Sequence, residues 1–153
     1  MNIIASTLKT IIEAQGLNYF RSVNINDLNQ QVGEKDVSAG LGVYTNLPEI
    51  VNRTFGKTNA VLMEYSVEVY YLQLNAETDD KGEAVDVILD ALKPLADGLI
   101  DQINRSGIIA TGQFIEDYNL DAVETLKMTK EVLSGWRLAF AIPIFRSVFD
   151  CEI

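Results

Sequence analysis

The residues of this chain best suited to chemistry are carboxylates, and they are concentrated in one part of the sequence. Residues 76–124 hold twelve Asp and Glu against three basic residues, so this third carries −9 of the formal net charge of −10. Five of these carboxylates recur at helical spacing and project into one narrow arc, forming an acidic row: Glu83, Asp86, Asp90, Asp97 and Asp101. Such a row can be an ordinary solvated helix face, can repel a polyanion, or can hold a hard cation such as calcium. No neighbouring loop supplies the alternating oxygen ligands that calcium prefers.

The sequence offers few residues for other kinds of catalytic or metal-binding site. The chain has no histidine, and its only cysteine is Cys151, so an intrachain disulfide and a Cys/His zinc site are excluded. Without histidine, a nucleophilic serine or cysteine would need a lysine or carboxylate base. Residues 40–42 (GLG) are too short for a dinucleotide fingerprint, and residues 107–112 lack the Gly-Lys-Ser/Thr ending of a phosphate loop. We therefore expect no enzyme activity, no cofactor and no metal.

Composition limits the class of protein further. With 153 residues, of which 48% are hydrophobic and 22% charged, residues 1–153 are expected to form a single globular domain. The net charge of −10 disfavours binding to nucleic-acid phosphates and to anionic lipids. No apolar run reaches membrane-spanning length, and the first residues lack the basic and apolar blocks of a signal peptide. The sequence thus predicts synthesis in the cytoplasm and no membrane association.

Two long elements should position the acidic row. Residues about 59–74 alternate apolar and polar side chains, as a half-buried strand requires, although the phase slips near residues 70–71. Either a β-bulge or a strand end buried on both faces would explain this slip. Residues about 83–106 have apolar side chains at helical spacing, with Pro94 expected to kink the helix or remove one hydrogen bond. Its buried face should include Val85, Leu89, Leu92, Leu99 and Ile103.

Shorter elements complete the expected order of α–β–β–β–α–β–β. Before the long strand we expect a short amphipathic helix at about 2–15, a strand from Leu17, a polar loop at 26–42, a short strand at 43–45 and a connection at 52–59. After the long helix we expect a strand near 123–129, a turn at Ser134–Gly135 and a last strand from Trp136. Pro143 in that last strand indicates an edge position or a bulge. One long helix between groups of strands indicates an α+β fold, with a mostly antiparallel sheet packed against that helix.

Three segments carry a resemblance to a known family. The strand YSVEVYYLQL, the acidic amphipathic helix from Glu83 and the final strand SGWRLAFAIPIF resemble the tail terminator and tail-completion proteins of tailed bacteriophages. These proteins share an N-terminal helix, a strand like residues 67–70 (VEVY), one long helix and a last strand of alternating large apolar residues. The resemblance implies a structural virion protein that forms a ring, usually a hexamer, at the tail terminus or the head–tail neck. Residues 26–42 and 108–131 depart from the pattern, so both positions stay open.

The resemblance also implies roles for particular residues. DNA would pass through the ring without specific binding, with the acidic row facing the lumen and repelling phosphates. Other neck or tail proteins would be partners. Subunit contacts are expected from the last strand and from a C-terminal extension at about 146–153: Trp136, Phe140, Phe145, Phe149 and Ile153. Burial of these side chains in their own core is the alternative at that position. For the whole protein, the alternative is a small acidic adaptor that binds a basic protein partner.

Overall fold

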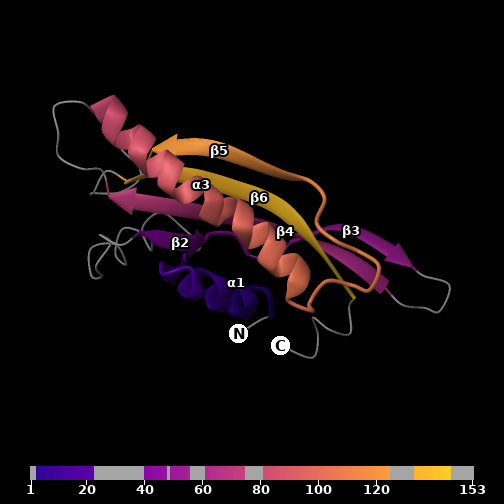
Figure 1. Ribbon diagram of the computed structural model, residues 1–153. Coiled ribbons are helices and arrows are strands. Elements are labelled where there is room, and N and C mark those ends of the chain that lie inside the picture. Colours follow the sequence, from indigo (N-terminus) through magenta and orange to yellow (C-terminus); the bar gives the residue numbers. More distant parts are fainter. Residues whose placement is uncertain are drawn as a thin grey trace.

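The computed structural model describes residues 3–22, 40–47, 49–55, 61–74, 81–124 and 133–145. They form two helices and a sheet of six strands (Figure 1). In chain order the elements are α1 (Ile3–Ala14), β1 (Asn18–Arg21), β2 (Leu41–Tyr44), β3 (Glu49–Phe55), β4 (Val61–Leu74), α3 (Lys81–Arg105), β5 (Tyr118–Glu124) and β6 (Leu133–Phe145). The predicted α+β class is confirmed.

The sheet is built around β4. Its strand order is β1-β2-β4-β6-β5, with β3 pairing β4 next to β2, and all pairs except β1–β2 are antiparallel. Strand β6 follows one side of β4 from Leu62↔Phe145 to Leu74↔Leu133. On the other side, the first half of β4 pairs with β3 and the second half with β2. The mostly antiparallel sheet and the short N-terminal helix were both predicted.

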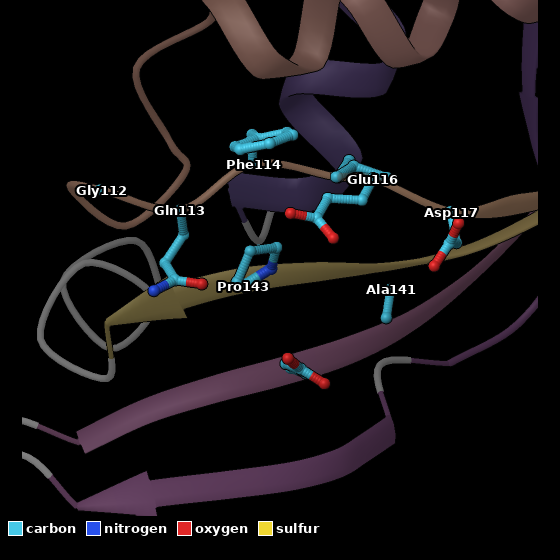
Figure 2. Close-up of a pocket in the computed structure, with 9 residues that line it drawn as sticks. Gly112, Gln113, Phe114, Glu116, Asp117, Ala141 and Pro143 are labelled. Atoms are coloured by element: carbon cyan, nitrogen blue, oxygen red, sulfur yellow. The ribbon is translucent and has the colours of Figure 1, made fainter.

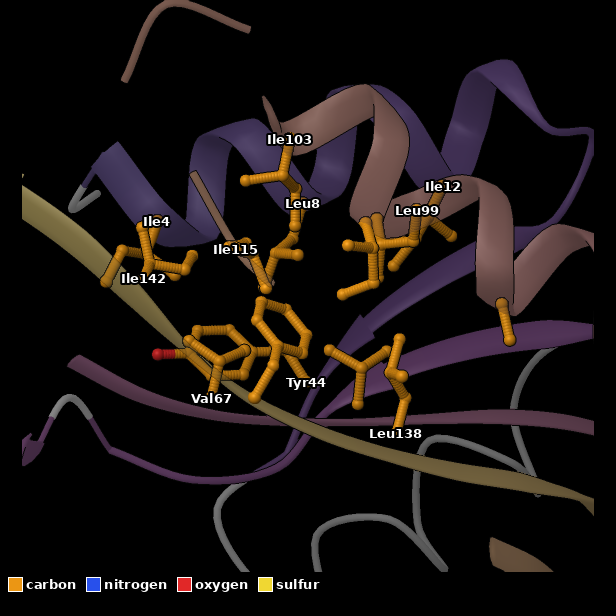
Figure 3. Close-up of a cluster of buried hydrophobic side chains, with 14 of the residues drawn as sticks. Ile4, Leu8, Ile12, Tyr44, Val67, Leu99, Ile103, Ile115, Leu138 and Ile142 are labelled. Atoms are coloured by element: carbon orange, nitrogen blue, oxygen red, sulfur yellow. The ribbon is translucent and has the colours of Figure 1, made fainter. Parts of the chain in front are cut away.

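Both helices cover the same face of this sheet. The main core joins residues of α1, α3, β4 and β6, as Figure 3 shows for Leu8, Leu99, Val67 and Leu138. The odd-numbered side chains of β4 face this core, because strand residues alternate between the two faces. A smaller apolar cluster lies on the opposite face and contains Phe20, Leu41, Val43, Leu72 and Leu133.

The second cluster explains the slip in the β4 pattern. Tyr71 and Leu72 are both fully buried, one in each apolar cluster. The register between β4 and β6 continues without interruption through these two residues. Of the two explanations considered, burial of the strand end on both faces is therefore correct.

Helix α3 agrees with its prediction in position but not in every buried residue. Leu92, Leu99 and Ile103 are buried as expected, and the helix continues through Pro94. Val85 and Leu89 are only partly buried. Figure 1 shows the start of α3 reaching past the tip of β5, so these first turns have less of the sheet beneath them.

Strand β3 was not predicted. Residues 52–59 were expected to be a connection, yet Glu49–Phe55 pairs with β4, and the register shifts between Ile50 and Asn52. This shift is a β-bulge, which breaks the alternation on which the sequence prediction depended. Most of the strand is exposed, so it also lacks an apolar pattern. Strand β5 lies earlier than the expected strand at 123–129, of which residues 125–129 are outside the described ranges.

The expected turn at Ser134–Gly135 was also wrong, because both residues lie inside β6. A Cβ atom at Gly135 would lie 1.7 Å from the Tyr71 carbonyl oxygen, so the glycine allows a close backbone approach rather than a turn.

Pro143 lies in a central strand, but β5 does not extend alongside it, because the pairing of β5 with β6 stops at Phe140. The Pro143 carbonyl accepts a hydrogen bond from Ala110 N (2.9 Å) on the side of β6 that faces away from β4. An N–H at this position would point to the same side, so the proline removes no hydrogen bond between β4 and β6.

Candidate functional site

The acidic row lies on the outer surface of α3. Four of its side chains, Glu83, Asp86, Asp90 and Asp101, are exposed, and Asp97 is partly buried. The opposite side of the helix holds the buried residues that pack on the sheet. The amphipathic pattern of the sequence therefore places the row correctly on the face directed away from the core.

The carboxylates of the row differ in their partners. Asp97 Oδ1 accepts a hydrogen bond from the Tyr118 hydroxyl of β5 (2.7 Å), and this bond is the main cause that raises the pKa of Tyr118. Asp101 forms an ion pair with Arg105 at 3.3 Å, in which both side chains are largely exposed. Among the described residues, Asp86 and Asp90 have no hydrogen-bond or ion-pair partner. Uncompensated charge is therefore concentrated in the first half of α3.

Further exposed carboxylates lie in the segment before β5. Glu116 and Asp117 are exposed in the segment that precedes β5. They line a shallow pocket of about 320 Å³, formed where residues 112–117 pass over Glu64, Ala141 and Pro143 of the sheet (Figure 2). The exposed ring of Phe114 lies at the same pocket. Among the described residues, three carboxylates and no base line it, so the electrostatic preference of this lining is for a cation.

Within the described ranges, no group of three His, Cys, Asp or Glu side chains is arranged to hold a metal ion. The segment above the pocket is instead fixed by amide hydrogen bonds, because Ile115 N donates to Asn104 Oδ1 (2.7 Å) and Asn104 Nδ2 donates to Ile115 O (3.3 Å). These bonds fix the backbone of the segment that carries Glu116 and Asp117.

The five residues expected at subunit contacts differ in where the structure places them. Phe140 is only 7% exposed and belongs to the core of its own chain, which was the alternative to a contact role. Trp136 packs against the same core, and its indole Nε1 donates to the Leu89 carbonyl (2.9 Å). Both rings face the helices because β6 alternates its large apolar residues on that side. Phe145 is partly buried, and Phe149 and Ile153 lie outside the described residues, as does the expected extension at 146–153.

A polar network on the helix-free face of the sheet was not predicted. Arg137 donates two hydrogen bonds to Glu68 Oε2, from Nη2 (2.6 Å) and Nε (3.0 Å), and its Nη1 lies 3.5 Å from Asp121. The Thr45 hydroxyl donates to the other oxygen of Glu68 (2.9 Å). The hydrogen bond to Glu68 is the main cause that raises the pKa of Arg137. Glu68 and Arg137 each occupy a polar position of an alternating strand, but the sequence does not reveal that these strands are neighbours.

Comparison with known proteins adds no relative. No protein-family model matches this chain, and no curated protein matches it. No helix in the described part of the chain is long and apolar enough to cross a membrane. A function for this protein must therefore follow from its fold, its charge and its exposed surfaces.

Proposed function

We propose that this protein is a structural component of a tailed-bacteriophage virion and forms a ring at the tail terminus or the head–tail neck, through which DNA passes. The observation that carries this proposal is the exposed acidic row along a 25-residue helix, on an α+β fold of the kind that the sequence resemblance implies. The proposed role is non-enzymatic and requires no cofactor or metal. The subunit would be made in the host cytoplasm, would assemble as a hexamer and would contact other neck or tail proteins.

The dimensions of α3 suit a lumen wall. At about 1.5 Å rise per residue, the row from Glu83 to Asp101 is about 27 Å long, close to the height of a small domain. Carboxylates along such a wall repel phosphates, whereas lysines would each add a favourable contact and slow the movement of DNA. The acidic row would act as a non-adhesive lining.

Charge reversal at Asp86 and Asp90, which have no partner among the described residues, tests this role. The double variant Asp86→Lys/Asp90→Lys leaves the buried face of α3 unchanged, so the ring is expected to assemble normally. Its lumen should then retain DNA, with a tighter apparent Kd at low salt and a steeper salt dependence than wild type. The measurement is DNA binding by the assembled protein over a range of salt concentrations.

A matched control changes the same amount of charge elsewhere. The variant Glu13→Lys/Glu116→Lys alters two exposed carboxylates, one on α1 and one before β5. Stronger DNA binding by the α3 variant than by this control supports a lumen-facing row. Equal binding by the two variants would assign the row to an ordinary solvated face.

The pocket beside Phe114 favours one alternative function. Its lining of Glu64, Glu116 and Asp117 suits a lysine or arginine side chain, as expected for an acidic adaptor that binds a basic protein. An adaptor would remain monomeric at all concentrations until a basic partner is added. A ring subunit would instead self-associate as its concentration rises or when phage tail tubes are added, so sedimentation velocity with and without tail tubes separates the two functions.

A further inference from the structure

Two strands at opposite sides of the sheet have open outer edges. Within the described residues, β5 pairs with β6 alone and β3 pairs with β4 alone. Most of their side chains are exposed, including Val51 at 53% and Tyr118 at 38%. The remaining edge strand, β1, differs because Asn18 and Phe20 take part in further interactions. In the described part of the chain, the sheet therefore presents two rows of backbone donors and acceptors that no other strand pairs, one on each side.

We propose that β5 of one copy pairs with β3 of the next copy, so that the sheet continues from subunit to subunit. This inference rests on the proposed ring, because a ring needs one surface of a subunit to bind a different surface of its neighbour. Two unlike edges on opposite sides of one sheet meet that requirement. Pairing of backbone groups along an edge is also an established mode of strand addition.

The strand directions determine how the edges meet. Strand β3 is antiparallel to β4, and β5 runs in the same direction as β4 because two antiparallel steps through β6 separate them. Arg53 of β3 is level with Met63 of β4, whereas Leu120 of β5 is level, through Leu138, with Val69, so a sheet that continues from copy to copy closes with its strands tilted to the ring axis. Such a continuous sheet preserves strand direction from one copy to the next. Strand β5 of one copy and β3 of the next are therefore antiparallel, which is the more favourable arrangement for backbone hydrogen bonds.

The charges of the two edges are complementary. Residues 116–124 contain four acidic residues and no base, whereas Arg53 is the only charged residue in the stretch Asn52–Phe55 of β3. The positive charge of Arg53 at the outer edge of β3 is attracted by the acidic edge of β5. Pairing unlike edges also avoids the contact of β5 with a second β5, which would place acidic residues against each other.

The bulge in β3 limits the register. It interrupts the regular edge at Val51, leaving Asn52–Phe55 as the continuous stretch that a neighbour can pair. Arg53 lies on the helix-covered face, opposite Met63, and Tyr118 and Leu120 lie on that face of β5, opposite Phe140 and Leu138. Pairing Arg53 with Leu120 places Thr54 opposite Asn119 and puts the guanidinium on the face where Asp97 binds Tyr118.

Disulfide formation between copies tests this register. In a Cys151→Ser background, the double variant Thr54→Cys/Asn119→Cys is oxidised at concentrations where assembly is observed. Each subunit then offers one thiol to each neighbour, so non-reducing gels should show a ladder of covalent multimers. A mixture of the two single variants should give dimers only, because each subunit has one thiol. The matched control Arg53→Cys/Asn119→Cys places the thiols on opposite faces and should give no ladder.

The outcomes separate this inference from the proposed function. Rings in electron micrographs together with a ladder support both. Rings without a ladder, or with an equal ladder from the opposite-face control, overturn the β5–β3 pairing while leaving the ring intact. A monomeric protein with neither rings nor a ladder at any concentration, with or without phage tail tubes, contradicts both proposals. Charge reversal by Arg53→Glu should also weaken assembly at least tenfold relative to Lys93→Glu, and equal assembly of these variants counts against the charge complementarity.

Discussion

The two faces of the sheet are stabilised by different chemistry. The face covered by α1 and α3 is closed by a continuous apolar core, in which residues such as Leu92 and Leu99 are almost completely buried. The other face has a small apolar cluster at one end and, near its centre, the network of Glu68, Arg137 and Asp121. This difference indicates that the helix-covered face supplies most of the folding free energy, while the helix-free face contributes a polar surface of fixed geometry.

The largest effect should come from the helix-covered face. Leu92→Ala removes a side chain that is 2% exposed and leaves a cavity between α3 and the sheet, so the free energy of unfolding should fall by about 2–5 kcal/mol. Denaturant unfolding measures this change. The matched control is Val87→Ala on the outer side of the same helix, where the side chain is 62% exposed and the loss should stay within roughly 0.5 kcal/mol. Similar losses for the two variants would mean that the buried face of α3 is misassigned.

An intermediate effect is expected on the helix-free face. Glu68 and Arg137 have partly exposed side chains, so a double-mutant cycle with Glu68→Gln and Arg137→Met should give a coupling energy of roughly 1–2 kcal/mol. The comparison pair, Asp121 and Arg137, is longer at 3.5 Å, and its carboxylate is more exposed. Its coupling should be below roughly 0.5 kcal/mol. A stronger coupling for Asp121 than for Glu68 would disprove the assigned order of these contacts.

One further effect is absent at neutral pH and appears only at alkaline pH. Burial raises the pKa of Tyr19 from 10.0 to about 12, although the nearby Arg21 charge opposes this shift. The folded chain therefore holds the phenolic proton more tightly than the unfolded chain does, and this part of the stability is complete below pH 10 and is lost as pH rises towards 12. In Tyr19→Phe, the free energy of unfolding should decline less steeply between pH 10 and 12 than in wild type. An unchanged slope would show that Tyr19 is solvated in the folded state.

The regular elements of the fold could be predicted from the sequence, and the irregular ones could not. The alternation in β4 and the helical spacing in α3 are repeated over many residues, so both elements and the exposed acidic row could be predicted from the sequence. Strand β3 could not, because its bulge and exposure remove the periodic signal. The position of Gly135 inside β6 depends on the Tyr71 backbone of a neighbouring strand, 64 residues away in sequence. Likewise, the contacts of Arg137 depend on strand neighbours that no local pattern specifies.

The central claim is that this chain forms a ring with an opening for DNA. The most direct measurement is electron microscopy of the purified full chain over a range of concentrations, alone and mixed with phage tail tubes. The proposed function predicts closed rings of uniform subunit number with a central opening, present alone or capping the ends of the tubes. Particles that remain monomeric at every concentration and leave the tube ends bare would contradict it.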